Sequence, residues 1–216
     1  GETAYLPATL AAVIMLLPGL DLTVATRDLA TGFSVSGTAR LGSVGIVLGS
    51  LAFGTVLGRT LAILIVGPIP DLAPLLVAPE YLALAVLLTA VLFAILFSAE
   101  LRDWPWLLTA VLLGWGGAYF GNWLLDMPLG ALIGGLTVGL AGNIYGRITN
   151  RPASIMHTPG LIILVPGALG FKSINNIINA DVVTGVETGM IVVLTALAIA
   201  LGMILASVLV VPRGEL

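Results

Sequence analysis

Apolar residues fill seven long stretches of the chain, and polar or turn-forming residues separate them. The stretches cover residues 4–17, 36–66, 81–99, 106–125, 129–148, 153–165 and 182–211. Long apolar runs with few charges are typical of helices that lie in a bilayer. The pattern therefore predicts an all-α fold, a polytopic transmembrane helix bundle.

Composition supports a membrane protein. Hydrophobic residues make up 59% of the 216 residues and charged residues 9%, against about 25% charged in an ordinary soluble domain. A crossing takes about 20 apolar residues, so the chain has room for about six to eight spans in the lipid bilayer. The net charge of −3 provides no basic surface, so nucleic acid is not an expected partner. With no Cys and one His, we expect no metal site and no cofactor.

A proline-rich segment divides the chain. Residues 67–80 hold four prolines, which cannot continue a helix: Pro68, Pro70, Pro74 and Pro79. We expect an extracellular loop here, between the end of a first membrane repeat at 1–66 and a second repeat at 81–216. The chain starts without Met and is hydrophobic by Leu6, with no basic region before it. We therefore expect that an N-terminal part of the full protein is missing.

The basic residues are unevenly distributed between the two ends of the stretches. If all seven cross, Arg59 and Lys172 lie on or near one side, and six arginines lie on the other: Arg27, Arg40, Arg102, Arg147, Arg151 and Arg213. Because Lys and Arg are retained on the cytoplasmic face, this split predicts an external start and a cytoplasmic C-terminus.

Two Pro-Gly pairs give the chain an internal repeat. A shift of 148 positions places the segment LLPG at 16–19 on LVPG at 164–167, Gly37 on Gly185 and Gly54 on Gly202. Five hydrophobic stretches separate the starts of the two copies, and an odd number of crossings inverts the second copy. Secondary transporters often have inverted repeats with the substrate bound where discontinuous helices meet. Two unrelated kinks are the alternative.

The Pro-Gly pairs predict broken helices. Proline removes a backbone N–H and glycine adopts dihedrals closed to other residues, so Pro18-Gly19 and Pro166-Gly167 end one helix and begin another. Such breaks are tolerated in a membrane only when they are buried in protein or line a watery cavity. A half-helix beginning after the break directs N–H groups at the gap and suits a carboxylate. Pro159-Gly160 is expected to lengthen the irregular stretch.

Polar residues follow both breaks and supply the candidate site. The predicted substrate-binding residues are Pro18, Gly19, Asp21, Thr23, Pro166, Gly167, Lys172, Asn175 and Asn176. Asp21 and Asp28 are the proton-coupling candidates, since ionisable residues within a span are costly and commonly functional. In the alternative interpretation, Arg27 and Asp28 lie at the cytoplasmic interface.

Other polar residues and the glycines have structural interpretations. For Asn122 and Asn143 we favour interhelical hydrogen bonds, and for His157 a solvated loop position. Glycine recurs at four-residue spacing, which predicts helix-packing faces. The pairs are Gly45/Gly49, Gly54/Gly58, Gly117/Gly121, Gly130/Gly134, Gly135/Gly139 and Gly142/Gly146.

Two motifs resemble those of the bacterial threonine/serine exporters. The segment PGLDLTVATRDLATGFSVSGTARL resembles the pattern at the end of the family's first membrane half, with Pro18, Gly19, Arg27, Asp28, Leu29, Gly32, Ser36, Gly37 and Arg40. The segment NRPASIMHTPGLIILVPGALG is similar to its second-half signature, with Arg151, Pro152, Ala153, Pro159, Gly160, Pro166 and Gly167.

The resemblance implies a function and a setting. It implies proton-driven export of small amino acids, threonine and serine, across the bacterial cytoplasmic (inner) membrane by about ten spans in two halves. This chain would supply the last seven. The absent spans would come from a missing N-terminal region or a partner subunit, and a homo-oligomer is possible.

Two other function classes remain open at this point. A channel or a scaffold subunit of a membrane complex would use the same hydrophobic pattern. An intramembrane enzyme needs a nucleophile and a base within reach. Ser154 and His157, three residues apart, are the best such pair, but capping explains the serine equally well. We expect no enzyme.

Overall fold

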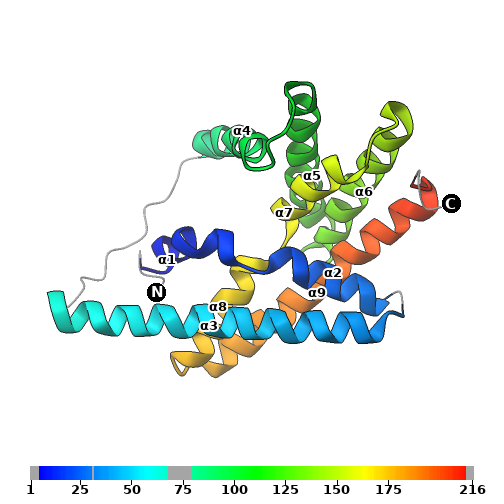
Figure 1. Cartoon of the computed structure of the whole chain (residues 1–216). Coiled ribbons are helices and arrows are strands. Elements are labelled where there is room, and N and C mark those ends of the chain that lie inside the picture. The colour runs from blue at the N-terminus through cyan, green and yellow to red at the C-terminus, as the bar shows by residue number, and fades with distance from the viewer. Residues whose placement is uncertain (1–4, 31, 68–78, 213–216) are drawn as a thin grey trace.

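The structure, a computed structural model, describes residues 5–30, 32–67 and 79–212, and this part of the chain is helical with short connections (Figure 1). In chain order the elements are α1 (Tyr5–Val13), the short helix η1 (Ile14–Leu16), α2 (Gly19–Ala30), α3 (Ser34–Val66), α4 (Pro79–Leu96), the short helix η2 (Leu101–Asp103), α5 (Trp104–Leu125), α6 (Gly130–Thr149), α7 (Ser154–Leu164), α8 (Gly167–Ile178) and α9 (Val182–Leu209). The predicted all-α membrane fold is confirmed. The predicted proline-rich loop lies mostly outside the described residues.

Three segments are long and apolar enough to cross a membrane among the residues described. They are Ser34–Val66, Ser154–Ile178 and Val182–Leu209, and the second of them includes the Pro166-Gly167 pair. The 11 residues of α7 reach only about 16 Å at ~1.5 Å per residue, roughly half of a ~30 Å hydrocarbon core. The prediction that residues 153–165 cross alone is therefore wrong, because only α7 together with α8 is long enough. Residues 4–17 are too short for the same reason.

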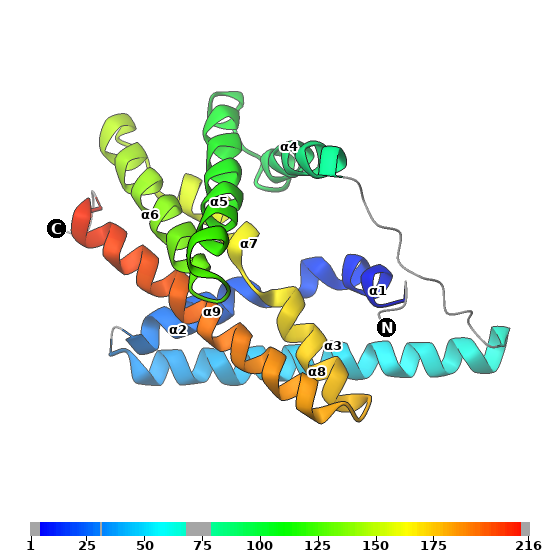
Figure 2. The ribbon, with the colours of Figure 1, turned by 180° about the vertical axis from the view of Figure 1, so that it is seen from behind.

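The helices pack in two groups that share α9. α5 and α6 lie side by side, and α7 and α9 pack against them (Figure 1). α2 packs on α3, and both cross the pair formed by α8 and α9 (Figure 2). The core of this second group is apolar and contains Leu22, Val44, Leu48, Phe171 and Val192. The first part of the chain is therefore joined to the last by a hydrophobic cluster.

The helix boundaries keep the offset of the sequence repeat. A shift of 148 positions places the start of α2 on the start of α8, the end of α2 on the end of α8, and the start of α3 on the start of α9. Packing repeats too. A Cβ atom placed on Gly37 would contact the side chain of Leu29 and the carbonyl oxygen of Ala25, and one placed on Gly185 would contact Ile177 and the carbonyl oxygen of Ser173. The same shift relates these two sets of contacts, so the repeated segments fold alike locally.

The predicted glycine faces divide into packed and bare ones. Gly121 faces Gly130 where α5 meets α6, and Gly135 faces Ile199 where α6 meets α9. On α3, by contrast, a Cβ atom placed on any of the four predicted glycines would meet no other atom of the described residues within 4 Å; these are Gly45, Gly49, Gly54 and Gly58. The packing prediction is confirmed for α5 and α6, whereas these four glycines of α3 have no packing partner among the described residues.

Pro159-Gly160 does not lengthen the irregular stretch, contrary to prediction. α7 runs through both residues as a helix. The pair lies in the second turn, where the missing N–H of proline leaves one carbonyl unpaired without ending the helix. Gly160 instead allows close approach of α5, since a Cβ atom on Gly114 would lie 2.8 Å from the Gly160 carbonyl oxygen.

Candidate functional site

Both remaining Pro-Gly pairs interrupt the helices at the same relative place. Leu17 and Pro18 separate η1 from α2, and Val165 and Pro166 separate α7 from α8. Leu17 has φ −68° and ψ 124°, and Val165 has φ −68° and ψ 130°. A residue before proline adopts this extended conformation because the proline ring clashes with a helical neighbour. One local rule thus produces both interruptions.

The two interruptions contact each other. A Cβ atom placed on Gly167 would lie 3.4 Å from Gly19 Cα and 3.3 Å from Leu17 Cβ. One placed on Gly19 would lie 3.5 Å from Gly167 Cα and would overlap the side chain of Val165. The contact is reciprocal, because the shift that relates the two repeats places Leu17 on Val165 and Gly19 on Gly167. Reciprocal contacts of this kind are expected around a two-fold axis.

A pocket of about 200 Å³ opens beside the second interruption, and we call it the break pocket. Its walls come from α5, the α5–α6 connection, α6, the end of α7, the start of α8 and α9. They include Asn122, Pro128, Ile163, Pro166, Ala168 and Thr195. No charged side chain lines it.

Two polar atoms at the break pocket have no hydrogen-bond partner in the described part of the chain. They are Asn122 Oδ1 and Thr195 Oγ1, and the Thr195 residue is only 5% exposed. A buried polar atom without a partner costs about 1–3 kcal/mol, and native proteins rarely keep one without a reason. Both residues line the break pocket, and both atoms keep an unused hydrogen-bonding capacity.

The ends of two helices add backbone groups. Pro166 lacks the N–H that would otherwise bond the Ile162 carbonyl, so the last turn of α7 has unpaired acceptors. The first N–H groups of α8 have no acceptor within their helix, and Ala168 and Leu169 of this turn line the pocket. The break pocket thus combines donors with a positive helix end on one side and acceptors on the other.

The acidic candidates lie elsewhere, in a cluster between α2 and α3. Asp28 Oδ2 lies 3.3 Å from Arg40 Nε, and Asp21 Oδ1 lies 3.6 Å from Arg40 Nη1. Ser36 Oγ donates to Asp28 Oδ2 at 2.8 Å. The side chain of Asp21 is 61% exposed and that of Asp28 is 21% exposed. We call these four residues the acidic cluster, and none of them lines the break pocket.

The other motif residues near the acidic cluster shape the turn between α2 and α3. Gly32 has φ +89°, a conformation that side chains rarely adopt. Gly37 lies against Leu29. Arg27 lies on α2, and its side chain is outside what the structure describes.

The remaining predicted substrate residues do not line the break pocket. Thr23 is 4% exposed, and its Oγ1 atom lies 3.5 Å from the Gly19 carbonyl oxygen of its own helix. Lys172, Asn175 and Asn176 are half-buried on α8 and are absent from the lining residues.

Arg151 begins the second motif and pairs with acids at the other end of α7. It bonds Asp103, whose side chain is 7% exposed, and lies 3.5 Å from Glu100. The hydrogen bond to Asp103 raises the pKa of Arg151 above its ordinary value, so the guanidinium stays charged. Pro152 is exposed beside it, and Pro159 is buried in α7.

Of the possible catalytic pair, His157 lies against α6. His157 Nε2 lies 3.3 Å from the Gly139 carbonyl oxygen of α6, and a Cβ atom on Gly142 would overlap its ring. Ser154, by contrast, is exposed at the start of α7. The imidazole therefore packs between helices, which also corrects the prediction of a solvated loop histidine.

Sequence reasoning missed Thr195 and misjudged Asn122. Asn143 makes the predicted type of bond, since its Nδ2 donates to the Val210 carbonyl at 2.8 Å. Asn122 makes no such side-chain bond among the described residues, and its Oδ1 atom stays unpaired. The available signal for Thr195 was a polar residue inside the strongly apolar run of α9.

Comparison with known proteins gives matches over most of the chain. Residues 82–209 match the family model described as "Threonine/Serine exporter, ThrE", and a second model, also of a threonine/serine exporter, matches residues 3–62. The two matches flank the proline-rich segment. The matched models describe transporters and not enzymes.

Two curated yeast proteins are also similar. Pheromone-regulated membrane protein 10 of Saccharomyces cerevisiae strain ATCC 204508 / S288c is 23% identical over 231 aligned residues, which cover 96% of this chain and 60% of that protein. The protein of the same name in strain YJM789 is also 23% identical, over 96% of this chain and 30% of its own length. The chain thus spans less than two thirds of these relatives. No solved structure matches.

Proposed function

Since the chain belongs to the threonine/serine exporter family, we propose that the break pocket binds threonine or serine during export from the cytoplasm. One observation carries the proposal. The reciprocal contact of Gly19 with Gly167 brings both interruptions to one point, beside a pocket with two unpaired polar atoms.

The groups at the pocket complement a small hydroxylated amino acid. The start of α8 receives the carboxylate, and the acceptors at the end of α7, with Asn122 Oδ1, receive the ammonium group. Thr195 Oγ1 both donates and accepts, which suits the substrate hydroxyl. A site that bonds a substrate hydroxyl discriminates strongly against an analogue without it.

Size and charge agree with this ligand. The volume of about 200 Å³ corresponds to roughly seven water molecules at ~30 Å³ each, which is the size range of a small amino acid. A zwitterion has no net charge, and the pocket wall carries none. Charged amino acids would leave one group without a counter-charge in a low-dielectric site.

We propose an inverted repeat as the basis of movement. The shift of 148 positions that relates both the helix starts and the glycine contacts supports two copies, α1–α3 and α7–α9. In this arrangement, rocking one copy against the other opens the pocket to alternate sides. We further propose that α9 ends at the cytoplasm, which the arginine distribution favours.

We propose that export is coupled to protons through the acidic cluster. Asp28 is its least exposed acid, and it is held between Arg40 and Ser36. Protonation of Asp28 would weaken its ion pair with Arg40 and leave Arg40 paired with Asp21 alone. Asp21 is the exposed entry to the same network.

Further helices are proposed to cover α3. Gly202 of α9 packs on α6, where a Cβ atom would overlap the Leu132 carbonyl. Its repeat equivalent, Gly54, contacts nothing among the described residues. Helices from elsewhere in the complete protein, from a partner subunit or from a second copy would complete this face.

Transport by the complete protein tests the function. In proteoliposomes with a proton gradient directed inward, labelled threonine should move against its own gradient. Thr195→Val should lower that flux at least tenfold, whereas Thr60→Val, an exposed threonine bonded to its own helix, should not. Flux that ignores the proton gradient would favour a channel, and absence of flux would reject the proposal.

A further inference from the structure

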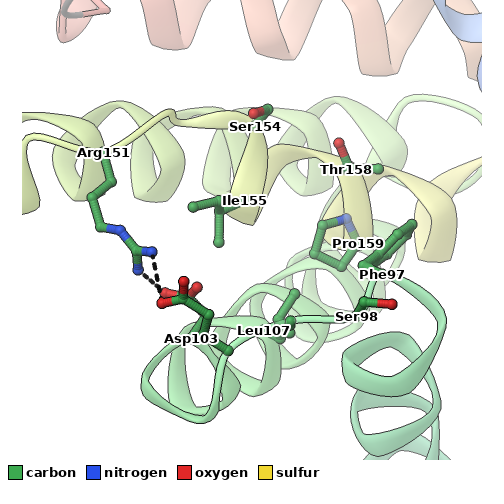
Figure 3. Close-up of a pocket in the computed structure, with 11 residues that line it drawn as sticks. Phe97, Ser98, Asp103, Leu107, Arg151, Ser154, Ile155, Thr158 and Pro159 are labelled. Carbon is green, nitrogen blue, oxygen red and sulfur yellow. Dashed lines mark hydrogen bonds and ion pairs between the residues drawn. The ribbon is translucent and has the colours of Figure 1, made fainter.

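A second pocket lies at the other end of α7. It has a volume of about 340 Å³ and is formed by the α4–η2 connection, η2, the start of α5, the α6–α7 connection and the start of α7 (Figure 3). We call it the arginine pocket. It shares no lining residue with the break pocket. Ser154 to Pro159 of α7 border one pocket, and Ile163 to Leu164 border the other.

Both signs of charge line the arginine pocket. Figure 3 shows the Arg151 side chain reaching across to Asp103. Arg151 Nη2 also lies 3.5 Å from Glu100 Oε2, whose side chain is 60% exposed. Arg102 also pairs with Glu100, so two carboxylates face two guanidiniums and the charges balance. Balanced charges complement a zwitterion, because its ammonium group can bond a carboxylate and its carboxylate can bond a guanidinium.

The pocket also has groups for a carboxylate and an apolar body. A guanidinium has five N–H donors, and the three acceptors near Arg151, on Asp103, Glu100 and Tyr145, leave some of them available. The pocket wall also includes Ser154, the first residue of α7, and a negative charge is favoured at a helix start. Leu107, Ile155 and Pro159 form the apolar part of the wall.

We propose that the arginine pocket is a second binding site for a zwitterionic amino acid, an inference that rests on the proposed function. The ligand's ammonium group lies at the exposed Glu100, and its carboxylate lies at the remaining N–H groups of Arg151, near the start of α7. Its carbon chain contacts Ile155 and Pro159. The break pocket recognises the same molecule through neutral groups, so the two sites differ in chemistry.

Close packing separates the two sites. A Cβ atom on Gly160 would lie 2.7 Å from Val138 and 3.2 Å from the Ala110 carbonyl oxygen, and Gly114 approaches from α5. A ligand in the arginine pocket reaches the break pocket only after α7 has moved away from α5. Both sites can therefore be filled at once.

Equilibrium binding tests the second site. The complete protein in lipid nanodiscs is titrated with labelled L-threonine, and we expect two molecules per chain. Ile155→Phe, whose larger side chain fills the arginine pocket, should leave one bound threonine per chain, in the break pocket. Thr195→Val should also leave one, in the arginine pocket. Ile148→Phe is the matched control, because Ile148 lies on α6 and is 71% exposed. This variant should keep two bound threonines per chain.

Glu100→Gln keeps the test valid if Ile155→Phe does not fold. The exposed Glu100 does not support the buried Asp103, and its neutralisation should raise the dissociation constant of one site about tenfold or more, the effect of one charge-assisted hydrogen bond. The second site would be overturned if the wild type binds one threonine per chain, and if Thr195→Val abolishes that binding while Ile155→Phe and Glu100→Gln leave it unchanged. The proposed function would then remain intact. No threonine bound by the wild type would overturn both.

Discussion

Gly19 and Gly167 contact each other, although they lie 148 positions apart in the chain. Each follows a proline, each begins a helix, and each faces the residue two positions before the other. Two local interruptions thereby become one structural feature, because the absence of side chains lets the backbones meet.

The first prediction concerns this contact. Gly19→Ala should destabilise the protein by about 1–3 kcal/mol, as overpacking does, because its Cβ atom overlaps the Val165 side chain. Gly167→Ala should cost less, since its nearest contact is 3.3 Å. Val165→Ala should rescue Gly19→Ala, measured by thermal unfolding in detergent. An equal loss of stability from Gly19→Ala with and without Val165→Ala would contradict this packing.

The second prediction concerns the unpaired atoms of the break pocket. Thr195→Val and Asn122→Leu remove buried polar atoms that have no partner, so stability should stay the same or rise by about 1 kcal/mol. Threonine transport should fall at least tenfold in both variants. Stability and flux measured on the same preparations separate the two effects. A parallel loss of stability and flux would indicate that these polar groups have a structural role.

The third prediction concerns the acidic cluster. Exposed ion pairs contribute about 0–1 kcal/mol, so Asp21→Asn should leave stability nearly unchanged, and Asp28→Asn should have the larger effect because Asp28 is less exposed. Both variants should weaken the dependence of threonine flux on the proton gradient. Counterflow of threonine without a gradient is the control and should persist. Unchanged gradient dependence in both would remove the cluster from coupling.

The fourth prediction concerns Arg151 and Asp103. Asp103→Ala should destabilise by about 1–3 kcal/mol, below the roughly 3–5 kcal/mol of a fully buried pair, because Arg151 keeps some solvent contact. Arg151→Lys keeps the positive charge but should not reproduce the hydrogen-bond geometry of the guanidinium. The pKa of Arg151 is raised, so its stabilising effect is present below its ordinary pKa and is lost only at strongly alkaline pH. Unfolding measured across neutral pH should show no change attributable to this residue.

The fifth prediction compares two equivalent glycines. Gly202→Leu should destabilise the chain because α6 leaves no room, whereas Gly54→Leu should not. If further helices cover α3, Gly54→Leu should nevertheless lower flux in the complete protein. Cross-linking from cysteines placed beside Gly54 would identify the covering segment. Full flux in Gly54→Leu would indicate that this face of α3 contacts lipid and not further helices.

The sequence was sufficient to predict what depends on local rules. Proline and glycine determine where η1 and α7 stop, and apolar runs determine where α3, α5, α6 and α9 lie. The failure at Pro159 has the same basis, because a proline early in a helix removes one bond without ending the helix. Span length was misjudged at 153–165, since the hydropathy pattern stops at the proline and the membrane-length unit continues into α8.

Long-range contacts were beyond sequence reasoning. Asp103 and Arg151 lie 48 positions apart, and no spacing rule joins a residue of η2 to the start of α7. Asp21 was placed near the break by its position in the chain, but its side chain turns to Arg40 on α3. Thr195 resembles an ordinary residue of an apolar helix until α5 and α8 are packed around it.

The unpaired atoms of the break pocket affect the empty protein as well as the loaded one. Without a ligand, Asn122 Oδ1 and Thr195 Oγ1 keep their desolvation penalty; a hydroxylated ligand removes it on arrival. If the protein passes through this arrangement between its two open states, as the proposed rocking movement requires, the occupied protein passes more easily than the vacant one. The return of the vacant protein is then the slow step of the proposed cycle. Exchange of internal for external threonine should therefore be faster than net export.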